Sequence, residues 1–438
     1  MDHTPSYAEQ TILAARLERV AREQLGLAAD SPIRRDIERL TRAWEGETFA
    51  RVKRAVEQLL AERERERLIG ERVPPPDTFA SGDLTLGEAR TPHGEPARVA
   101  ASSSELPPGF VIVGPPGKGK TTLARRLLRQ VVGRLPSVRI VVLDSTQSYV
   151  DVCRDPATWA NIPWPELRLN VFRAPVGYPY HLWKAQQVEA LAQGELLHSR
   201  YLVLKRLDRL FAEYKVPERE DGLSIVPSLF TLRTDLETHR EKPGSREEGY
   251  RAAALTVIDG RLRSTGSVFD CARGMEDLLT DGRVRVDTHG LTPPESSQYL
   301  TTYFMNYIVC RRSLRPLLEP PRLEMLLVIE DCQALIEGAL HDILTRYQEF
   351  LLEARSRGLA IVFIAHDLAT IAPQVLAGIS NYAIFGQSSA RNKDLARDLL
   401  DLSASEKDLL GRLPKGQCFL KLGGHGQFPF PFVMRVLP

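Results

Sequence analysis

Hydrophobic positions divide the chain into a helical first part and a later part in which short strands alternate with helices. Apolar residues recur at helical spacing over Ile12–Leu25, and Ser6 begins a capping-box pattern ahead of them. A second helix is predicted from Ser31-Pro32, because serine caps a helix and proline suits its first position. A third helix is predicted over residues 47–68. The chain is therefore expected to begin with a helical module.

Proline and serine runs mark the segment that follows this module. Three consecutive prolines lie at 74–76 and three serines at 102–104. Such residues are typical of turns and extended chain rather than of helix or strand interiors. We therefore predict a linker with little local structure over residues 73–109. It separates a helical N-terminal module at 1–72 from a large domain at 110–438.

From residue 110 onward short apolar runs alternate with helical patterns. Strands that are apolar along their length are typical of a parallel sheet covered by helices on both faces. The predicted fold class is therefore α/β with a mostly parallel sheet. The predicted strands are residues 110–113, 138–143, 323–329 and 359–365, with helices at 120–133 and 340–356.

The pattern is less regular between about residues 155 and 320. Helices are expected over Leu182–Tyr214 and Gln298–Leu314, and a strand over Val284–Val286. Pro243-Gly244-Ser245 lies among charged residues and predicts an exposed loop. We interpret this region as an insertion of unrecognised type within the large domain.

A glycine-rich segment follows the first of the predicted strands and matches the pattern G-x-x-x-x-G-K-[ST] in full. Glycines let the backbone turn its N–H groups toward phosphates, and the next helix adds the positive end of its dipole. Lys120 is placed to reach the terminal phosphates of ATP, and Thr121 to coordinate Mg²⁺. ATP and Mg²⁺ are therefore the expected cofactors. The expected contacts are Gly114, Pro115, Pro116, Gly117, Lys118, Gly119, Lys120, Thr121 and Thr122.

Two acids, Glu330 and Asp331, follow the apolar run Leu326–Ile329. Where a phosphate loop is present, a strand of this kind lies beside it, and its acids serve the Mg²⁺ shell and the attacking water. We assign Glu330 to magnesium and Asp331 to the general-base role, although the two roles can be exchanged. Acids after strands are also common turn residues, so this assignment depends on the phosphate loop.

Three further polar residues flank the last predicted strand of this set. His366 follows the strand and is interpreted as a sensor of the terminal phosphate or the water, the alternative being a cap for the next helix. Arg355 and Arg357 precede the strand at a helix end. They are either favourable charges at that helix terminus or an arginine finger that reaches a neighbouring subunit's nucleotide.

Composition adds few restrictions. The 438 residues are 43% hydrophobic and 26% charged with a net charge of +2, which is ordinary for a soluble protein and neither demands nor excludes a nucleic-acid partner. The five cysteines are scattered, which fits a reducing cytoplasm. No apolar run approaches the roughly 20 residues of a membrane helix, and no signal peptide is evident. We expect a cytoplasmic protein without a membrane partner.

The order of these parts resembles the HerA/FtsK superfamily, which includes HerA helicases, FtsK translocases and conjugative coupling ATPases. The resemblance is strongest over residues 110–150 and 323–436, and includes the strand ending at Asp144 and the "EARSRGLAIVFIAHDL" segment. It implies a RecA-like ATPase that forms a homohexameric ring and moves DNA through a central pore. It also implies a closing β-hairpin over Gly411–Val436.

Individual residues match this resemblance to different degrees. Glu330-Asp331 is similar to the paired acids of HerA, and Arg355 or Arg357 falls where the family has its R-x-x-G arginine. His366 falls where the family usually has glutamine, which leaves the coupling of hydrolysis to movement open. HerA proteins commonly begin with a small β-barrel that docks a nuclease, whereas this chain begins with helices.

Three functions follow from this combination. The first is a ring-forming, ATP-driven DNA translocase or helicase-like motor. The second is a regulatory scaffold that uses ATP to assemble and to switch an effector such as a nuclease. The third, an AAA+ ATPase, requires a C-terminal helical lid, which the strand-like end of the sequence argues against. Candidate DNA-phosphate contacts, each also readable as ordinary surface charge, are Lys205, Arg206, Arg209, Arg261, Arg263, Arg311, Arg312 and Arg315.

Overall fold

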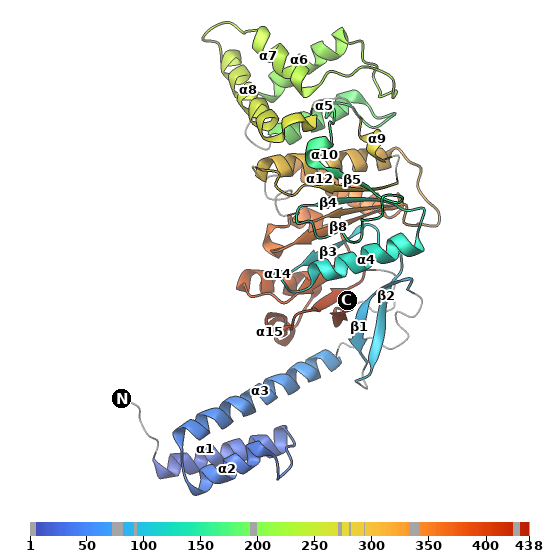
Figure 1. Ribbon diagram of the computed structural model, residues 1–438. Coiled ribbons are helices and arrows are strands. Elements are labelled where there is room, and N and C mark those ends of the chain that lie inside the picture. The colour runs from blue at the N-terminus through green and yellow to red at the C-terminus, as the bar shows by residue number, and fades with distance from the viewer. Residues whose placement is uncertain are drawn as a thin grey trace. The chain divides into compact units, whose positions relative to one another are not determined.

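The computed structural model divides the chain into two compact units, which are described separately (Figure 1). One unit comprises Met1–Val73 with Arg90–Glu95, and the other comprises Pro74–Ala89 with Pro96–Pro438. Some predicted segments lie partly outside the described residues, including most of the first half of the linker. The described residues are 6–71, 82–91, 94–192, 199–269, 274–279, 282–292, 294–332, 341–423 and 430–437.

The described elements of the first unit are helical. Its elements are α1 (Tyr7–Arg19), a π-helical turn (Val20–Gln24), α2 (Pro32–Arg42) and α3 (Gly46–Glu71). The capping box at the start of α1 is formed, since Ser6 N donates to Glu9 Oε2 at 2.7 Å and Glu9 N donates to Ser6 Oγ. The helices share a small core whose buried members are Ala21, Ile37, Leu40, Val52 and Val56.

The second unit is built on one large sheet and confirms the α/β fold class. The strand order is β2-β1-β11-β10-β9-β3-β8-β7-β4-β6-β5. Every pairing from β9 to β5 in this order is parallel, whereas β10 and β11 are antiparallel to their neighbours. The strands are β1 (Leu84–Arg90), β2 (Pro96–Ala101), β3 (Gly109–Val113), β4 (Arg139–Asp144), β5 (Ala160–Pro163), β6 (Arg283–Asp287), β7 (Met325–Ile329), β8 (Leu359–Ala365), β9 (Asn381–Phe385), β10 (Gln417–Lys421) and β11 (Phe432–Val436).

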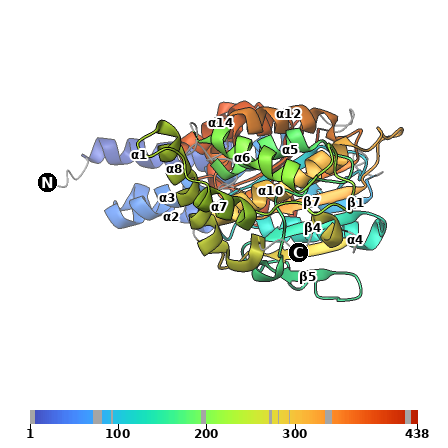
Figure 2. The same ribbon diagram turned by 90° about the horizontal axis from the view of Figure 1, so that it is seen from above.

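Helices cover both faces of this sheet, as fully apolar strands require. The connection from β3 to β4 runs through α4 (Lys120–Arg134), and the connection from β7 to β8 runs through α12 (His341–Ala354) in the opposite direction along the sheet. Right-handed crossovers then place the two helices on opposite faces, as Figure 2 shows. The α4 face carries a core that includes Leu127, Ile112 and Val142.

The segment expected as a linker contains two strands. β1 and β2 both belong to the sheet, and β1 pairs with β11 through Gly87–Val436 and Glu88–Arg435. The sheet contains these residues because Leu84 and Leu86 are fully buried in its core. The strands β1 and β2 are therefore part of the sheet, a difference from the linker that the prolines and serines predicted.

The expected closing hairpin is confirmed. The helices α14 (Ala390–Leu400) and α15 (Ala404–Arg412) lead into β10, and β11 returns antiparallel to it, with Cys418 opposite Met434. The chain thus returns to the sheet after these helices, which differs from the helical lid that an AAA+ interpretation needs.

Residues between β5 and β7 form mostly helices. The predicted strand at Val284–Val286 is confirmed as β6, and the predicted helix over 182–214 is present as two helices on either side of residues 193–198, which lie outside the described part of the chain. Most of these helices gather at the β5 end of the sheet (Figure 1). They are α5 (Tyr180–Ala192), α6 (Arg200–Glu213), α7 (Leu229–Thr238), α8 (Arg246–Thr265), α9 (Met275–Leu279) and α10 (Pro294–Ser313).

None of the helices within the described ranges has the length and apolar character that crossing a membrane requires.

Candidate nucleotide-binding site

The carboxyl ends of four neighbouring parallel strands meet at one edge of the sheet. The strands are adjacent in the order β3, β8, β7, β4, so the residues that follow them lie side by side at that edge. Gly114 follows β3, His366 follows β8 and Glu330 follows β7, while Asp144 ends β4. Ligands of open α/β sheets bind at such an edge.

The phosphate loop has the backbone conformation that its glycines allow. Gly117 has φ +75° and Gly119 has φ +117°, both in the left-handed region, and Gly119 is the N-cap of α4. Gly114 is required for a different reason, because a Cβ there would lie 2.6 Å from Cβ of Phe385. The loop therefore leads directly into a free helix N-terminus, which is an arrangement that binds phosphate.

Lys120 is buried at the mouth of this loop, with 4% of its surface exposed. Its Nζ donates hydrogen bonds to the carbonyl of Pro115 at 3.2 Å and to Nδ1 of His366 at 3.0 Å. Burial lowers the pKa of Lys120, while the negative charges of Glu330 and Asp331 oppose that shift. The lysine is thus held inside the loop beside the residue expected to sense phosphate.

Glu330 lies beside Thr121, as the predicted magnesium assignment requires. Thr121 Oγ1 donates to Glu330 Oε1 at 3.4 Å, and the hydroxyl of Tyr149 donates to Glu330 Oε2 at 2.7 Å. Glu330 is 8% exposed, and its burial raises the pKa of the carboxyl, although the hydrogen bond from Tyr149 works in the other direction.

Tyr149 and Asp144 form a support for Glu330 that the sequence did not reveal. Asp144 is fully buried and accepts hydrogen bonds from the backbone N–H groups of Ser148 at 3.0 Å and Tyr149 at 3.1 Å. Arg285 from β6 pairs with the same carboxylate at 2.8 Å. This carboxylate therefore fixes the turn after β4, and the turn aims the Tyr149 hydroxyl at Glu330. The only signal in the sequence was an acid at the end of a buried strand.

Asp331 has φ +56° and is exposed at the same edge, directly after Glu330. The left-handed conformation is uncommon for a residue other than glycine, though aspartate tolerates it better than most. The turn directs the chain away from β7, and Cys332 N then donates to Ile364 O of β8 at 3.0 Å. The general-base role of Asp331 stays a prediction.

The residues present fit a Mg²⁺–nucleotide. The loop offers N–H groups and a lysine for phosphate oxygens, and Thr121 and Glu330 offer the hydroxyl and carboxylate oxygens that Mg²⁺ prefers. Within the described ranges no three His, Cys, Asp or Glu side chains gather as a metal cage. Mg²⁺ is usually bound through one or two protein ligands together with substrate phosphates, so this donor set is sufficient.

The loop is also tied to the end of the sheet formed by the closing hairpin. Lys118 Nζ donates to Leu413 O at 3.3 Å, and Gly416 N donates to Lys118 O at 2.8 Å. The turn before β10 therefore helps to hold the phosphate loop, and the Lys118 ammonium is engaged with that turn.

Arg355 and Arg357 are not part of this edge. They precede β8, whose seven residues span roughly 20 Å, so they lie at the amino edge of the sheet. Arg357 donates to the carbonyls of Ser313 at 2.9 Å and Arg315 at 3.0 Å and pairs with Glu353. Neither arginine can reach the nucleotide site of its own chain. An arginine finger toward a neighbouring subunit stays a prediction.

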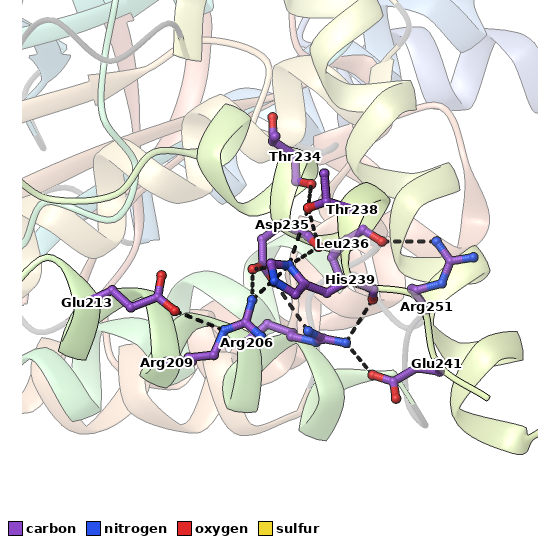
Figure 3. Close-up of polar contacts among 10 residues, drawn as sticks. All are labelled: Arg206, Arg209, Glu213, Thr234, Asp235, Leu236, Thr238, His239, Glu241 and Arg251. Atoms are coloured by element: carbon purple, nitrogen blue, oxygen red, sulfur yellow. Dashed lines mark hydrogen bonds and ion pairs between the residues drawn. The ribbon is translucent and has the colours of Figure 1, made fainter.

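Two of the candidate DNA contacts, Arg206 and Arg209, form ion pairs with an acid of the same chain. Figure 3 shows both guanidinium groups beside Asp235, between α6 and α7. Asp235 is 5% exposed and pairs with Arg206 at 3.7 Å and with Arg209, and Arg206 also donates to His239 O at 3.0 Å. These contacts join the two helices, whereas Lys205 on the same helix is exposed.

Comparisons with known proteins agree with this fold. No family model matches the sequence, and no curated protein matches it. The structure of VirB4 of Thermoanaerobacter pseudethanolicus aligns with a TM-score of 0.61 at 15% identity, covering 82% of this chain and 97% of VirB4. The bacterial conjugative coupling protein TrwBdeltaN70 aligns with a TM-score of 0.57 at 14% identity, covering 84% and 93%. TrwB in complex with ADP and Mg²⁺ aligns with a TM-score of 0.55 at 15% identity, covering 77% and 87%.

These similarities define the class of fold. The chain has the RecA-like P-loop fold that VirB4 and TrwB share. The phosphate loop, the acid strand and the polar strand end occupy neighbouring positions on that fold.

Proposed function

We propose that this chain is an ATPase that requires Mg²⁺. The observation that carries the proposal is the contact set around Lys120, Thr121 and Glu330. A lysine inside a glycine loop lies at a helix N-terminus, and a threonine hydroxyl lies 3.4 Å from a buried acid that follows β7, two strands away from β3. TrwB has been solved with ADP and Mg²⁺, which supports the same pair of ligands here.

Each residue has a defined part in this proposed reaction. The loop N–H groups and Lys120 bind and orient the phosphates, which is most of what catalysis of phosphoryl transfer demands. Thr121 and Glu330 would hold Mg²⁺, which would neutralise charge on the phosphates. Tyr149 would orient Glu330 through its hydrogen bond, and the proposed role of Asp331 is to accept a proton from water. His366 Nδ1 accepts a hydrogen bond from Lys120, so a phosphate bound to Lys120 would compete with His366 for the same ammonium.

We further propose that the ATPase acts as a DNA-translocating motor of the HerA/FtsK type that assembles as a homohexameric ring. The similarity to VirB4 and to conjugative coupling protein TrwB supports this choice among P-loop proteins. The location of Arg355 and Arg357 at the edge opposite the nucleotide site supports the ring, because a finger at that edge can serve only another subunit. The helical module at residues 1–72 is proposed to bind an effector or to help close the ring.

The test is the ATP turnover rate of the purified full chain, measured with and without double-stranded DNA, together with its mass in the same buffer. Turnover that rises severalfold with DNA in a hexamer supports the motor. Turnover in a monomer that ignores DNA contradicts it while leaving the ATPase proposal intact. No turnover under any condition, with Mg²⁺ present, contradicts both.

One observation favours a second candidate function. His366 occupies the position where the superfamily usually has glutamine, and it accepts a hydrogen bond from the phosphate-loop lysine. A lysine that is hydrogen-bonded to His366 is less available to the phosphates, which favours slow ATP turnover. Slow turnover would suffice for a regulatory scaffold whose ATP-dependent assembly switches a partner such as a nuclease. A ring that forms with ATP but whose slow turnover is indifferent to DNA supports this candidate. If His366→Gln makes ATP turnover fast and dependent on DNA, the histidine is what restricts the motor activity in the parent chain.

A further inference from the structure

The amino edge of the sheet contains a cationic pocket far from the phosphate loop. Its volume is about 450 Å³, and four of its lining residues are arginines. It lies at the start of β4, beside the end of α10 and the approach to β7, which places it at the sheet edge opposite Lys120. The lining residues are Ser137, Arg139, Arg312, Arg315, Arg322, Leu323 and Glu324.

One acid lines this pocket, and it is shared by two of the arginines. Glu324 accepts from Arg312 Nη2 at 3.1 Å and from Arg322 Nη2 at 3.1 Å. The arginine just before Arg312 on α10, Arg311, forms an ion pair with Glu276, which does not line the pocket. Its Nε lies 2.8 Å from Glu276 Oε1. The single carboxylate therefore cannot balance the positive charge of the four lining arginines.

Two lining arginines, Arg139 and Arg315, keep their guanidinium groups available. Across the ranges that the structure describes, neither guanidinium has a hydrogen bond or an ion pair. Arg139 is half-buried, and its pKa is lowered first by that burial and then by the like charges of Arg311 and Arg315. Like charges gathered in a partly buried pocket cost free energy, and a bound anion would remove that cost.

The geometry points to a second phosphate-binding site in this pocket, which takes the phosphate groups of a short polyphosphate such as pyrophosphate or a nucleotide's phosphate tail. Guanidinium groups present planar forks of N–H donors that match phosphate oxygens in pairs. The volume exceeds what a single phosphate fills and suits two or three linked phosphates. Arg312 and Arg139 line the inner part as buried and half-buried residues, whereas Arg315 and Arg322 are exposed, so the site has a charged floor and a charged entrance.

This inference does not depend on the proposed function, because no pocket residue belongs to the phosphate loop. The experiment uses the full chain carrying Lys120→Ala, which removes the phosphate-loop contribution, and measures pyrophosphate binding by calorimetry without Mg²⁺ at low salt. Binding is expected to persist in this background. Adding Arg139→Gln or Arg315→Gln is expected to weaken it by about tenfold or more, since each removes a charge-assisted contact. Arg397→Gln, an exposed arginine paired with Asp398, is the matched control and is expected to have no effect.

Absence of pyrophosphate binding in the Lys120→Ala chain would overturn the proposal, and so would binding that Arg139→Gln and Arg315→Gln both leave unchanged. Arg315 is exposed, so its substitution keeps the test valid if Arg139→Gln fails to fold. A parallel titration uses a single-stranded oligonucleotide. Loss of oligonucleotide binding in both variants, without any pyrophosphate binding, assigns the pocket to a nucleic-acid backbone and contradicts the polyphosphate site.

Discussion

Tyr149 and Glu330 are joined by a 2.7 Å hydrogen bond in which the phenol donates to Oε2 of the carboxylate. Both side chains are buried, and burial together with the negative charge of Glu330 raises the pKa of Tyr149 well above its ordinary value. The phenol is therefore protonated at neutral pH and donates this hydrogen bond. One oxygen of Glu330 is thus held by the protein, and the other faces Thr121.

Tyr149→Phe is expected to reduce Mg²⁺-dependent ATP turnover by about 10- to 100-fold, because outer contacts of this kind orient the residues that hold metals. The loss is expected mainly as a higher Mg²⁺ requirement, measured by titrating Mg²⁺ at saturating ATP. Phenylalanine keeps the buried ring, so nucleotide binding without Mg²⁺ should not change. An unaltered Mg²⁺ titration would show that the hydrogen bond is only structural.

Lys120→Ala is expected to lower ATP turnover by roughly 100-fold or more, because the lysine is the charge that the loop directs at the phosphates. Lys118→Ala is the matched control. Its Nζ donates to Leu413 O rather than toward His366, so it should affect turnover far less. Equal turnover in the parent chain and the Lys120→Ala chain would remove the phosphate-loop assignment.

Glu330→Gln is expected to slow hydrolysis by roughly 100-fold while leaving ATP binding largely intact. It should also stabilise the nucleotide-free protein near pH 8. Burial raises the folded-state pKa of Glu330, so folding favours the protonated form and stability is lost as pH rises from about 4.5 through that raised pKa. The glutamine side chain does not ionise, so the variant does not lose stability in this way as the pH rises.

The pH dependence is measured as the urea midpoint of parent and variant at several pH values. The advantage of Glu330→Gln should be largest above neutral pH and shrink as the pH falls toward 4.5. Asp331→Asn is the comparison, because Asp331 is exposed and should slow hydrolysis without this stability gain. An advantage that does not vary with pH would show that the buried charge is not its cause.

Arg285→Ala is expected to destabilise the second unit by about 3 kcal/mol, since it leaves Asp144 as a fully buried carboxylate without its paired charge. The measurement is chemical unfolding of the full chain. Arg397→Ala, which removes an exposed ion pair, should change stability by less than about 1 kcal/mol. Similar values for the two variants would mean that the backbone donors to Asp144 suffice.

The two arginines before β8 should give different results. Arg357→Ala is expected to cost about 1–2 kcal/mol of stability in any oligomeric state, because it loses hydrogen bonds to the carbonyls of Ser313 and Arg315. Arg355→Ala is expected to lower turnover only in the assembled ring. Turnover is compared at protein concentrations above and below assembly. A loss from Arg355→Ala that is equal in isolated subunits would exclude a finger acting between subunits.

Much of the parallel sheet could be predicted from sequence because its strands carry their own signal. The run Leu359–Ala365 is apolar at every position and is buried throughout, so local pattern and final environment agree. β1 was missed, because the prolines at 74–76 and the serines at 102–104 predicted a linker. The strand is defined by its pairing with β11, where a Cβ at Gly87 would lie 2.2 Å from Arg435 O.

The residues of the candidate site also differ in how far the sequence could predict them. The phosphate loop is a contiguous pattern, so its residues could be assigned from the sequence alone. The support of Glu330 is not contiguous, since Tyr149 lies 181 positions away in a turn whose shape depends on Asp144. No local pattern records such a contact. The same holds for the arginine pocket, which joins the start of β4 to the end of α10.

The position of β3 in the sheet has a consequence for synthesis of the chain on the ribosome. β3 carries the phosphate loop, yet both of its neighbours, β8 and β9, are translated much later, and His366 follows Lys120 by 246 positions. The nascent chain therefore emerges with its phosphate loop and the apolar strand β3 unpaired. β3 can become a central strand only after β8 and β9 have left the ribosome, so the phosphate loop reaches its folded surroundings late in translation.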